Sequence, residues 1–234
     1  MKILYKFCLI IASAFLLISC EKETEDISRV THYVEFDIHG ENPTIVQVGE
    51  PYNDEGVVAT LEGKDVTSTV SVKSNVDYET MGMYKVEYTS VNADGLTSRA
   101  VRNVVVCNPA VTTDLSGTYT VAEGSHRIII ASGAKTVYSG YPVTIAKVAP
   151  GFFSVTDFFG GYYDKRANYG SSYAMKGYMA LNEDNTIDLV SSSIAGWGDS
   201  LNSLNDAFYD PATEEISWKA VYVGAYSFNV ILSK

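Results

Sequence analysis

The clearest structural signal in the sequence is the segment Tyr84-Lys85-Val86-Glu87-Tyr88-Thr89. Its large apolar residues alternate with polar ones, which is the period of a strand with one buried and one solvated face. Residues 57–61 and 66–72 are also rich in β-branched side chains, and the intervening Gly, Asn and Asp residues supply turns. Short strands without helical periodicity from residue 33 to 106 therefore predict a small β-sandwich.

A resemblance supports this prediction and refines it. The segment Gly49-Glu50-Pro51-Tyr52-Asn53-Asp54-Glu55-Gly56-Val57-Val58-Ala59 resembles the opening of a bacterial Ig-like domain common in surface lipoproteins, and Asp65-Val66-Thr67 continues the pattern. The resemblance implies an Ig-like β-sandwich over residues 32–108. In that fold Tyr84 would lie near a tyrosine corner, where a hydroxyl reaches back to upstream backbone. Such domains serve mostly as spacers, so the fold implies no catalysis.

The second half of the chain, residues 109–234, also predicts strands. It follows a boundary at Asn108-Pro109, because proline disfavours continued strand pairing. The strand candidates are residues 116–122, 127–131, 141–148, 152–158, 174–181, 186–190, 215–223 and 226–232. About eight antiparallel strands with short connections fit either a β-barrel or a second sandwich. Residues 200–207 carry a faint helical pattern through Leu201, Leu204 and Phe208, so one short helix is expected there.

This half resembles the C-terminal all-β domain, of no established activity, in lipoproteins from glycan-degrading gut bacteria. The resemblance is carried by Leu115-Ser116-Gly117-Thr118-Tyr119, Asp157-Phe158-Phe159-Gly160-Gly161-Tyr162-Tyr163 and Gly196-Trp197-Gly198. It implies a location and an architecture, and it assigns no reaction.

The N-terminus predicts export and lipid attachment. Lys2 and Lys6 precede an apolar run at 7–18, which is shorter than the roughly 20 residues that cross a bilayer. Residues 1–19 are therefore expected to be a cleaved signal peptide. Its end, Leu17-Ile18-Ser19-Cys20, resembles the bacterial lipobox, in which the cysteine is lipidated. Residues 20–31 then form an acidic tether, and the resemblance implies a lipid anchor in the outer membrane, with the protein on the cell surface.

The net charge and the cysteine content limit which partners the protein is expected to bind. The formal net charge is −11, and losing Lys2 and Lys6 with the signal makes it −13, which disfavours a nucleic-acid partner. With Cys20 acylated and the signal removed, Cys107 has no partner for a disulfide, and its apolar neighbours predict a buried free thiol. The membrane contact is expected through the N-terminal lipid alone.

Familiar catalytic and metal-binding motifs are absent from the sequence. The three histidines lack ligand spacing, so we expect no metal, no cofactor and no catalytic residue. A glycosidase would need two carboxylates flanking a sugar. A hydrolase of this kind stays open as a less favoured function, because four aspartates lie near the aromatic-rich loops: Asp157, Asp164, Asp199 and Asp206.

Aromatic residues are the positive functional signal. Of 17 tyrosines, 11 follow residue 115 and five of these lie between Tyr162 and Tyr178. Rigid rings beside Gly, Asp and Arg are typical of binding loops, and a sugar ring offers apolar C–H faces for stacking. Trp218 alternates with apolar strand residues and is expected in the core. The candidate ligand-binding residues are Trp197, Tyr162, Tyr163, Tyr169, Asp164 and Arg166.

The sequence therefore predicts a non-catalytic, lipid-anchored surface protein that binds a polysaccharide or other glycan through its C-terminal domain. The tyrosines could equally pack the barrel and join its hairpins. The alternative function is a structural or assembly component that binds another outer-membrane protein.

Overall fold

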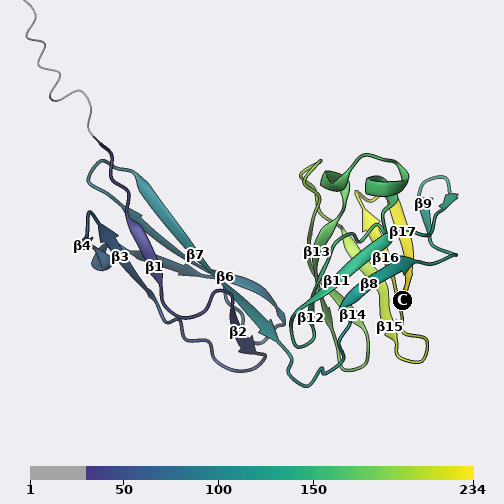
Figure 1. The fold of residues 1–234 in the computed structure, drawn as a ribbon, viewed down its shortest axis with the longest axis horizontal. Coiled ribbons are helices and arrows are strands. Elements are labelled where there is room, and N and C mark those ends of the chain that lie inside the picture. Colours follow the sequence, from purple (N-terminus) through teal and green to yellow (C-terminus); the bar gives the residue numbers. More distant parts are fainter. Residues whose placement is uncertain (1–29) are drawn as a thin grey trace, which may run out of the picture.

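A computed structural model describes residues 30–234, which form 17 strands and three short helical turns (Figure 1). The predicted signal peptide at 1–19, the lipidation site Cys20 and the first part of the tether, 21–29, lie outside the described residues. Within the described part, no helix has the length and apolarity to cross a membrane. The prediction of an all-β protein is confirmed.

The N-terminal domain is a sandwich of two sheets. One sheet has the strand order β1-β3-β4, with β1 at Glu35–Ile38, β3 at Val57–Leu61 and β4 at Lys64–Asp65. The other has the order β2-β7-β6-β5, with β2 at Thr44–Gln47, β7 at Thr97–Cys107, β6 at Gly82–Val91 and β5 at Ser71–Ser74. β2 runs parallel to β7, and the short turn η2 (Thr67–Thr69) precedes β5. This arrangement confirms the predicted Ig-like sandwich.

The alternating segment forms β6 and faces the sandwich core with alternate residues. Val86 and Tyr88 are fully buried, while Lys85 is exposed. β6 pairs with β7 along its whole length, so the two strands form a hairpin. The hydroxyl of Tyr84 donates to the carbonyl of Thr80 at 2.9 Å, four residues upstream. This contact confirms the predicted tyrosine corner.

An ion pair between a buried arginine and a partly exposed aspartate joins the two sheets of this sandwich. Arg102 of β7 is fully buried, and its Nε lies 2.8 Å from Oδ1 of Asp54. The same guanidinium donates to the carbonyl oxygens of His39 and Gly56, and the Tyr88 hydroxyl donates to Asp54 Oδ2 at 2.6 Å. Burial alone would raise the pKa of Asp54, but the tyrosine hydrogen bonds and the Arg102 charge hold that pKa below its usual value.

The C-terminal domain is one curled sheet of ten strands. Its order is β10-β9-β17-β8-β11-β12-β13-β14, and β16 pairs with both β17 and β15. The strands are β8 Gly117–Val121, β9 His126–Ile129, β10 Ala134–Val137, β11 Pro142–Ala149, β12 Phe152–Val155, β13 Lys176–Leu181, β14 Ile187–Ser193, β15 Ser203–Asp210, β16 Glu215–Tyr222 and β17 Tyr226–Ser233.

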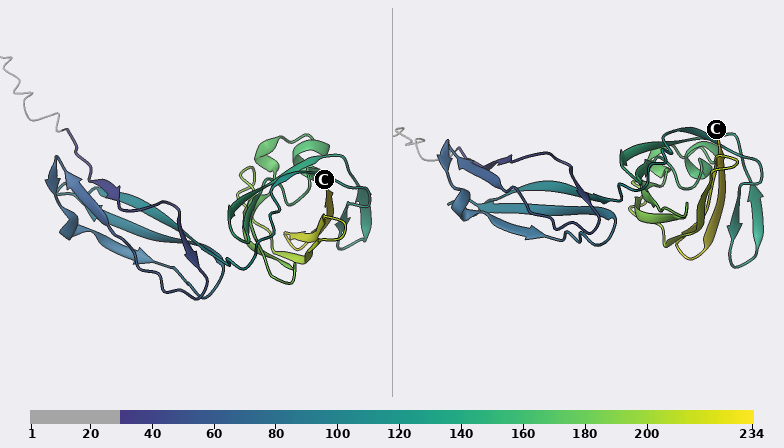
Figure 2. Two further views of the ribbon diagram at one scale, coloured as in Figure 1. Left: turned by 60° about the horizontal axis from the view of Figure 1, so that its bottom comes forward. Right: turned by 90° about the horizontal axis from the view of Figure 1, so that it is seen from below.

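Eight of these strands make a partly closed barrel, which Figure 2 shows from two further directions. A bridge between Thr186 and Phe208 brings β14 close to β15, and the Tyr209 N–H donates to the carbonyl of Asn185 at 2.9 Å. β9 and β10 form a hairpin added beside β17. Of the two architectures that the sequence left open, the sheet is therefore the barrel.

Two expectations for this domain need correction. The short helix predicted at 200–207 is wrong, because Ser203–Asp210 is strand β15. One extra residue between Asn205 and Phe208 shifts the register against β16, and this bulge breaks the alternation that marks a strand. The strand β10 was not predicted, since its four residues are mostly exposed and carry no apolar alternation.

The barrel encloses a continuous core of buried aromatic and aliphatic side chains. Trp218 is 2 % exposed, and its Nε1 donates to the carbonyl of Phe158 at 2.8 Å. This burial confirms the prediction for Trp218. Phe159 packs against Phe228 with ring centroids 4.2 Å apart, so the loop after β12 is anchored in the centre of the domain.

The two domains lie end to end and meet through a small apolar cluster (Figure 1). Val105 and Cys107 at the end of β7 pack with Ala149 and Phe152 of the barrel. Cys107 is a buried free thiol whose pKa is raised by burial, as the sequence predicts. A hydrogen bond from Asn108 to Glu183 at 3.0 Å also crosses the junction.

Removing the buried guanidinium should strongly destabilise the Ig-like domain. We expect Arg102→Met to lower the free energy of unfolding by about 3 kcal/mol or more, because Asp54 and the carbonyls of Glu41, His39 and Gly56 lose their partner. The matched control is Arg99→Met on the same strand, where a half-exposed side chain pairs with Glu87 and the loss should stay below about 1 kcal/mol. Calorimetry measures both, and equal losses would contradict the assigned role of Arg102.

Candidate functional site

The site is built on the loop between β12 and β13, which a single carboxylate holds in place. Asp157 is buried, and its Oδ1 accepts the N–H groups of Phe159 and Met175 at 2.9 Å each. Its Oδ2 accepts the N–H of Gly161, also at 2.9 Å. Burial raises the pKa of Asp157 to about 7, although the three N–H groups favour its charged form. Asp157 therefore ties both ends of the aromatic loop together.

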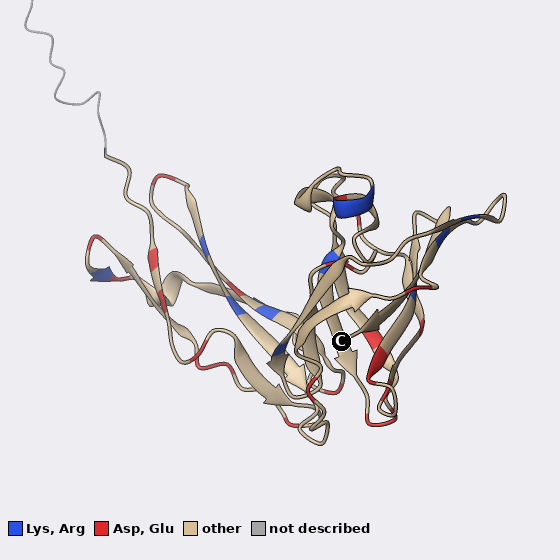
Figure 3. Ribbon diagram, turned by 45° about the vertical axis from the view of Figure 1, so that its right-hand side comes forward, with Lys and Arg blue, Asp and Glu red and all other residues tan. Residues whose placement is uncertain are grey.

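Two glycines turn this loop into a short helical segment above the barrel. Gly160 and Gly161 have φ of 61° and 77°, a region that L-residues rarely adopt. A Cβ on Gly161 would lie only 2.7 Å from the Cβ of Tyr141. The π-helical turn η3 (Tyr162–Arg166) follows at once, and its basic end is visible as the blue coil above the barrel (Figure 3).

A second loop carries Trp197 to the same place. Gly198 has φ of 74°, and a Cβ on Gly196 would lie 2.6 Å from the ring of Tyr173. The N–H of Gly196 donates to the carbonyl of Ser172 at 2.7 Å, which ties this loop to the turn η4 (Ser171–Tyr173). The flanking glycines thus permit the close approach that presents the Trp197 ring.

The aromatic residues of the two loops form one connected cluster. The Trp197 ring centroid lies 4.8 Å from Tyr173, 4.9 Å from Tyr163 and 6.0 Å from Tyr222. Trp197 is 40 % exposed and Tyr169 is 56 % exposed. Tyr163 is buried and contacts Phe228 of the core at 5.6 Å, so the exposed rings rest on buried ones.

An open pocket of about 510 Å³ lies among these rings and is called the aromatic pocket below. It is lined by Arg127, Tyr163, Tyr169, Trp197, Asp199, Tyr222 and Tyr226. Rings surround a few polar groups, which is the usual composition of a small-molecule site.

Hydrogen bonds fix the polar groups of the aromatic pocket. The Tyr222 hydroxyl donates to Asp199 Oδ2 at 2.8 Å, and burial together with this hydrogen bond raises the pKa of Tyr222 above its usual value. Burial raises the pKa of Tyr163, while a hydrogen bond with Arg127 opposes that rise. Both phenols therefore stay neutral at physiological pH and can serve as hydrogen-bonding groups.

The structure brings the predicted site residues into one region, in three different settings. Trp197, Tyr163 and Tyr169 line the aromatic pocket. Tyr162 is buried and does not line it, and the guanidinium groups of Arg127 and Arg166 lie 4.8 and 5.1 Å from its ring centroid. Asp164 lies on η3 and pairs with Lys165 at 3.1 Å.

Four residues of the aromatic pocket were not among the predicted ones. Arg127 and Tyr226 come from β9 and β17, whose pairing places Tyr226 opposite Ile129. Tyr222 ends β16 and Asp199 follows Trp197. Asp199 had a local signal, its position in the Gly-Trp-Gly loop. The strand residues had none, because pairing between distant segments decides their position.

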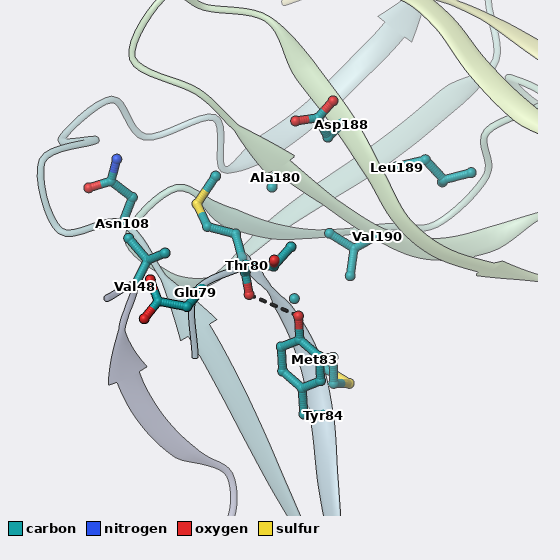
Figure 4. Close-up of a pocket in the computed structure, with 12 residues that line it drawn as sticks. Val48, Glu79, Thr80, Met83, Tyr84, Asn108, Ala180, Asp188, Leu189 and Val190 are labelled. Atoms are coloured by element: carbon teal, nitrogen blue, oxygen red, sulfur yellow. Dashed lines mark hydrogen bonds between the residues drawn. The ribbon is translucent and has the colours of Figure 1, made fainter. Parts of the chain in front are cut away.

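A larger groove of about 750 Å³ lies at the domain junction (Figure 4). Met83 and Tyr84 of the Ig-like domain and Leu189 and Val190 of β14 contribute to its walls. Glu79 and Asp188 also line it, but the one aromatic residue in its lining, Tyr84, is tied to Thr80. The groove offers no ring platform for a sugar, so the aromatic pocket is the better candidate.

Comparisons with known proteins agree with this architecture. A family model described as a bacterial surface protein Ig-like domain matches residues 36–106, and a model for a C-terminal domain matches 108–234, more than half of the chain. The crystal structure of the lipoprotein BT2262 from Bacteroides thetaiotaomicron is 38% identical, with a TM-score of 0.50. The match covers 86% of this chain and 100% of that one.

Two further solved structures match more weakly. Both come from ZmpB of Clostridium perfringens and contain the domain CBM51-2, one in complex with GlcNAc and with INT domains and one with the M60 catalytic domain and CBM51-1. They are 18% and 15% identical, with TM-scores of 0.27 and 0.30. They cover 53% and 55% of this chain, and 29% and 14% of their own. No curated protein matches the sequence.

The fold and the family models define a protein composed of an Ig-like domain, of the type described for bacterial surface proteins, and a C-terminal β-barrel domain. The chain belongs to the family of the lipoprotein BT2262.

The buried carboxyl of Asp157 should give the barrel a measurable pH dependence. Its pKa of about 7 in the folded state exceeds the roughly 3.9 of an unfolded chain. Its contribution to stability is therefore full below about pH 4 and is lost as the pH rises to about 7. In urea unfolding followed by tryptophan emission, the stability difference between wild type and Asp157→Asn should shrink across that range.

The control for this measurement is Asp210→Asn, which removes a surface carboxylate that accepts the N–H of Ala212. It should keep the wild-type pH profile. A stability difference for Asp157→Asn that grows with pH would contradict a raised pKa.

The two tryptophans should differ in their access to solvent. Trp197 is 40 % exposed and Trp218 is 2 % exposed, so acrylamide should quench only the Trp197 emission. We expect Trp197→Phe to leave a blue-shifted emission that resists quenching. Unchanged quenching in that variant would mean that the Trp197 ring is not accessible.

Proposed function

We propose that the protein is a non-catalytic, lipid-anchored binding protein of the outer-membrane surface, and that it contacts a glycan through the aromatic pocket. The single observation that carries the proposal is the exposed pair Trp197 and Tyr169 at a pocket that also holds Asp199 and Arg127. The rings offer stacking surfaces for the C–H face of a sugar. The carboxylate and the guanidinium offer an acceptor and donors for its hydroxyls.

The pocket needs little rearrangement to bind. The Trp197 ring is flanked by Tyr173 and Tyr222, and Tyr163 beneath it packs against the core. Side chains that are already fixed lose little entropy when a ligand arrives. The lipid anchor in this proposal rests on the lipobox resemblance at Cys20 and on membership in a family that includes a lipoprotein.

The arrangement of carboxylates supports a non-catalytic role. A glycosidase places two carboxyl groups roughly 5 to 10 Å apart across the scissile bond. Of the four aspartates near the loops, only Asp199 lines the aromatic pocket. Asp157 is buried on backbone N–H groups, and Asp164 and Asp206 pair with Lys165 and Lys219.

The alternative role in assembly with another outer-membrane protein would call for a large apolar patch on the surface. The exposed apolar side chains of the described residues are instead spread over separate elements. Ile45 lies on β2, Val72 on β5 and Phe208 on β15. Glycan binding is therefore the better supported function.

Truncating the exposed indole should remove glycan binding and leave the fold intact. In affinity electrophoresis with each polysaccharide that retards the wild type, we expect Trp197→Ala to weaken binding by about tenfold or more. Phe208→Ala is a matched control, because Phe208 has a similar exposure of 39 % in the same domain. Equal retention of Trp197→Ala and wild type on every such polysaccharide would refute the proposal.

A further inference from the structure

The aromatic pocket contains a cation that has no acidic partner. Arg127 lines the pocket, yet it pairs with no carboxylate among residues 30–234, and its Nε is buried without a hydrogen-bond partner there. Its guanidinium lies 4.8 Å from the Tyr162 ring centroid and 5.1 Å from that of Tyr226. Cation–π contacts stabilise such a group only modestly, so the donors that do not bond Tyr163 remain available.

A second guanidinium reinforces the positive charge. Arg166 lies 5.1 Å from the same Tyr162 centroid and has no carboxylate partner within the described part of the chain. The neighbouring Lys165 is paired with Asp164 at 3.1 Å. Two unpaired guanidinium groups therefore share one buried ring, in a protein whose net charge is −11.

The other charged residue of the pocket fits a sugar. Asp199 is the only carboxylate in the lining, and it already accepts the Tyr222 hydroxyl. A carboxylate can accept further hydrogen bonds, so Asp199 can take a sugar hydroxyl. A guanidinium among aromatic rings favours a planar or tetrahedral oxyanion, which it can bind through two N–H groups at once.

We propose that the aromatic pocket binds acidic glycans, with the oxyanion of the sugar on Arg127 and its ring on Trp197. This inference rests on the proposed glycan-binding function and specifies its ligand class. The oxyanion is either the carboxylate of a uronic acid or a sulfate ester, since both present the same acceptor geometry to a guanidinium. Arg166, which lies over the same Tyr162 ring as Arg127, adds attraction.

The test compares charged and uncharged forms of one polymer, using the full chain in mild detergent. The probes are polygalacturonic acid against its fully methyl-esterified form, and dextran sulfate against dextran. We expect at least one charged form to bind about tenfold or more tightly than its neutral form. The pair that shows the preference identifies carboxylate or sulfate as the source.

Substitutions assign the preference to the pocket. Arg127→Gln should abolish it, Arg166→Gln should reduce it about twofold to threefold, and Trp197→Ala should weaken binding of charged and neutral forms together. Lys147→Gln is the control, because Lys147 is an exposed basic residue of β11 outside the pocket. If Arg127→Gln fails to fold, the salt dependence of the wild type decides, since added salt should weaken binding of the charged form alone.

The outcomes separate the two proposals. Equal binding of charged and neutral forms, or a preference that survives Arg127→Gln or added salt, would overturn the acidic-glycan inference while glycan binding through Trp197 stands. Failure of the wild type to bind any of these polymers or any member of a broad glycan array would overturn both.

Discussion

The hydrogen bonds of Asp157 are the constraint on which the candidate site depends. This one carboxylate collects the N–H groups of Phe159, Gly161 and Met175, and so joins the start of the aromatic loop to the strand that follows it. With the loop fixed, Phe159 enters the core and η3 sits above the barrel mouth. Unpaired N–H groups in this buried position would each carry a desolvation cost. The conformation that pairs all three with Asp157 is therefore the favoured one for this loop.

In the Ig-like domain the corresponding buried group is a cation, and it binds backbone carbonyl oxygens. Arg102 gathers carbonyl oxygens of His39 and Gly56 and pairs with Asp54, whereas Asp157 gathers N–H groups. In each domain an ionisable side chain is tolerated inside because backbone groups of irregular segments hydrogen-bond to it. Arg102 stabilises the sandwich, and Asp157 stabilises a loop that carries exposed rings.

Features that depend on residues close together in the sequence could be predicted, whereas features that depend on pairing between distant segments could not. The alternation in 84–89 and the tyrosine corner are local, and both were predicted correctly. The helix expected at 200–207 failed because a bulge before Phe208 spaces Leu204 and Phe208 four residues apart within strand β15, as in a helix. At the site, Trp197 and Tyr169 carry local signals in glycine-rich loops. Arg127 carries none, since the β9–β17 pairing brings it there, and Tyr162 proved to be buried.

In the barrel domain the core side chains also support the aromatic pocket directly. The rings run without interruption from Phe228 in the core through Tyr163 to Trp197 at the surface. A ring held by buried neighbours presents its face at little cost in side-chain entropy. The tyrosines that pack the barrel and the aromatic pocket are thus two parts of one structure, and the two interpretations of these residues that the sequence left open do not exclude each other. Arg127 lies over the rings of Tyr162 and Tyr226 in the same domain, and the low polarity of such surroundings would strengthen its proposed attraction for an anion.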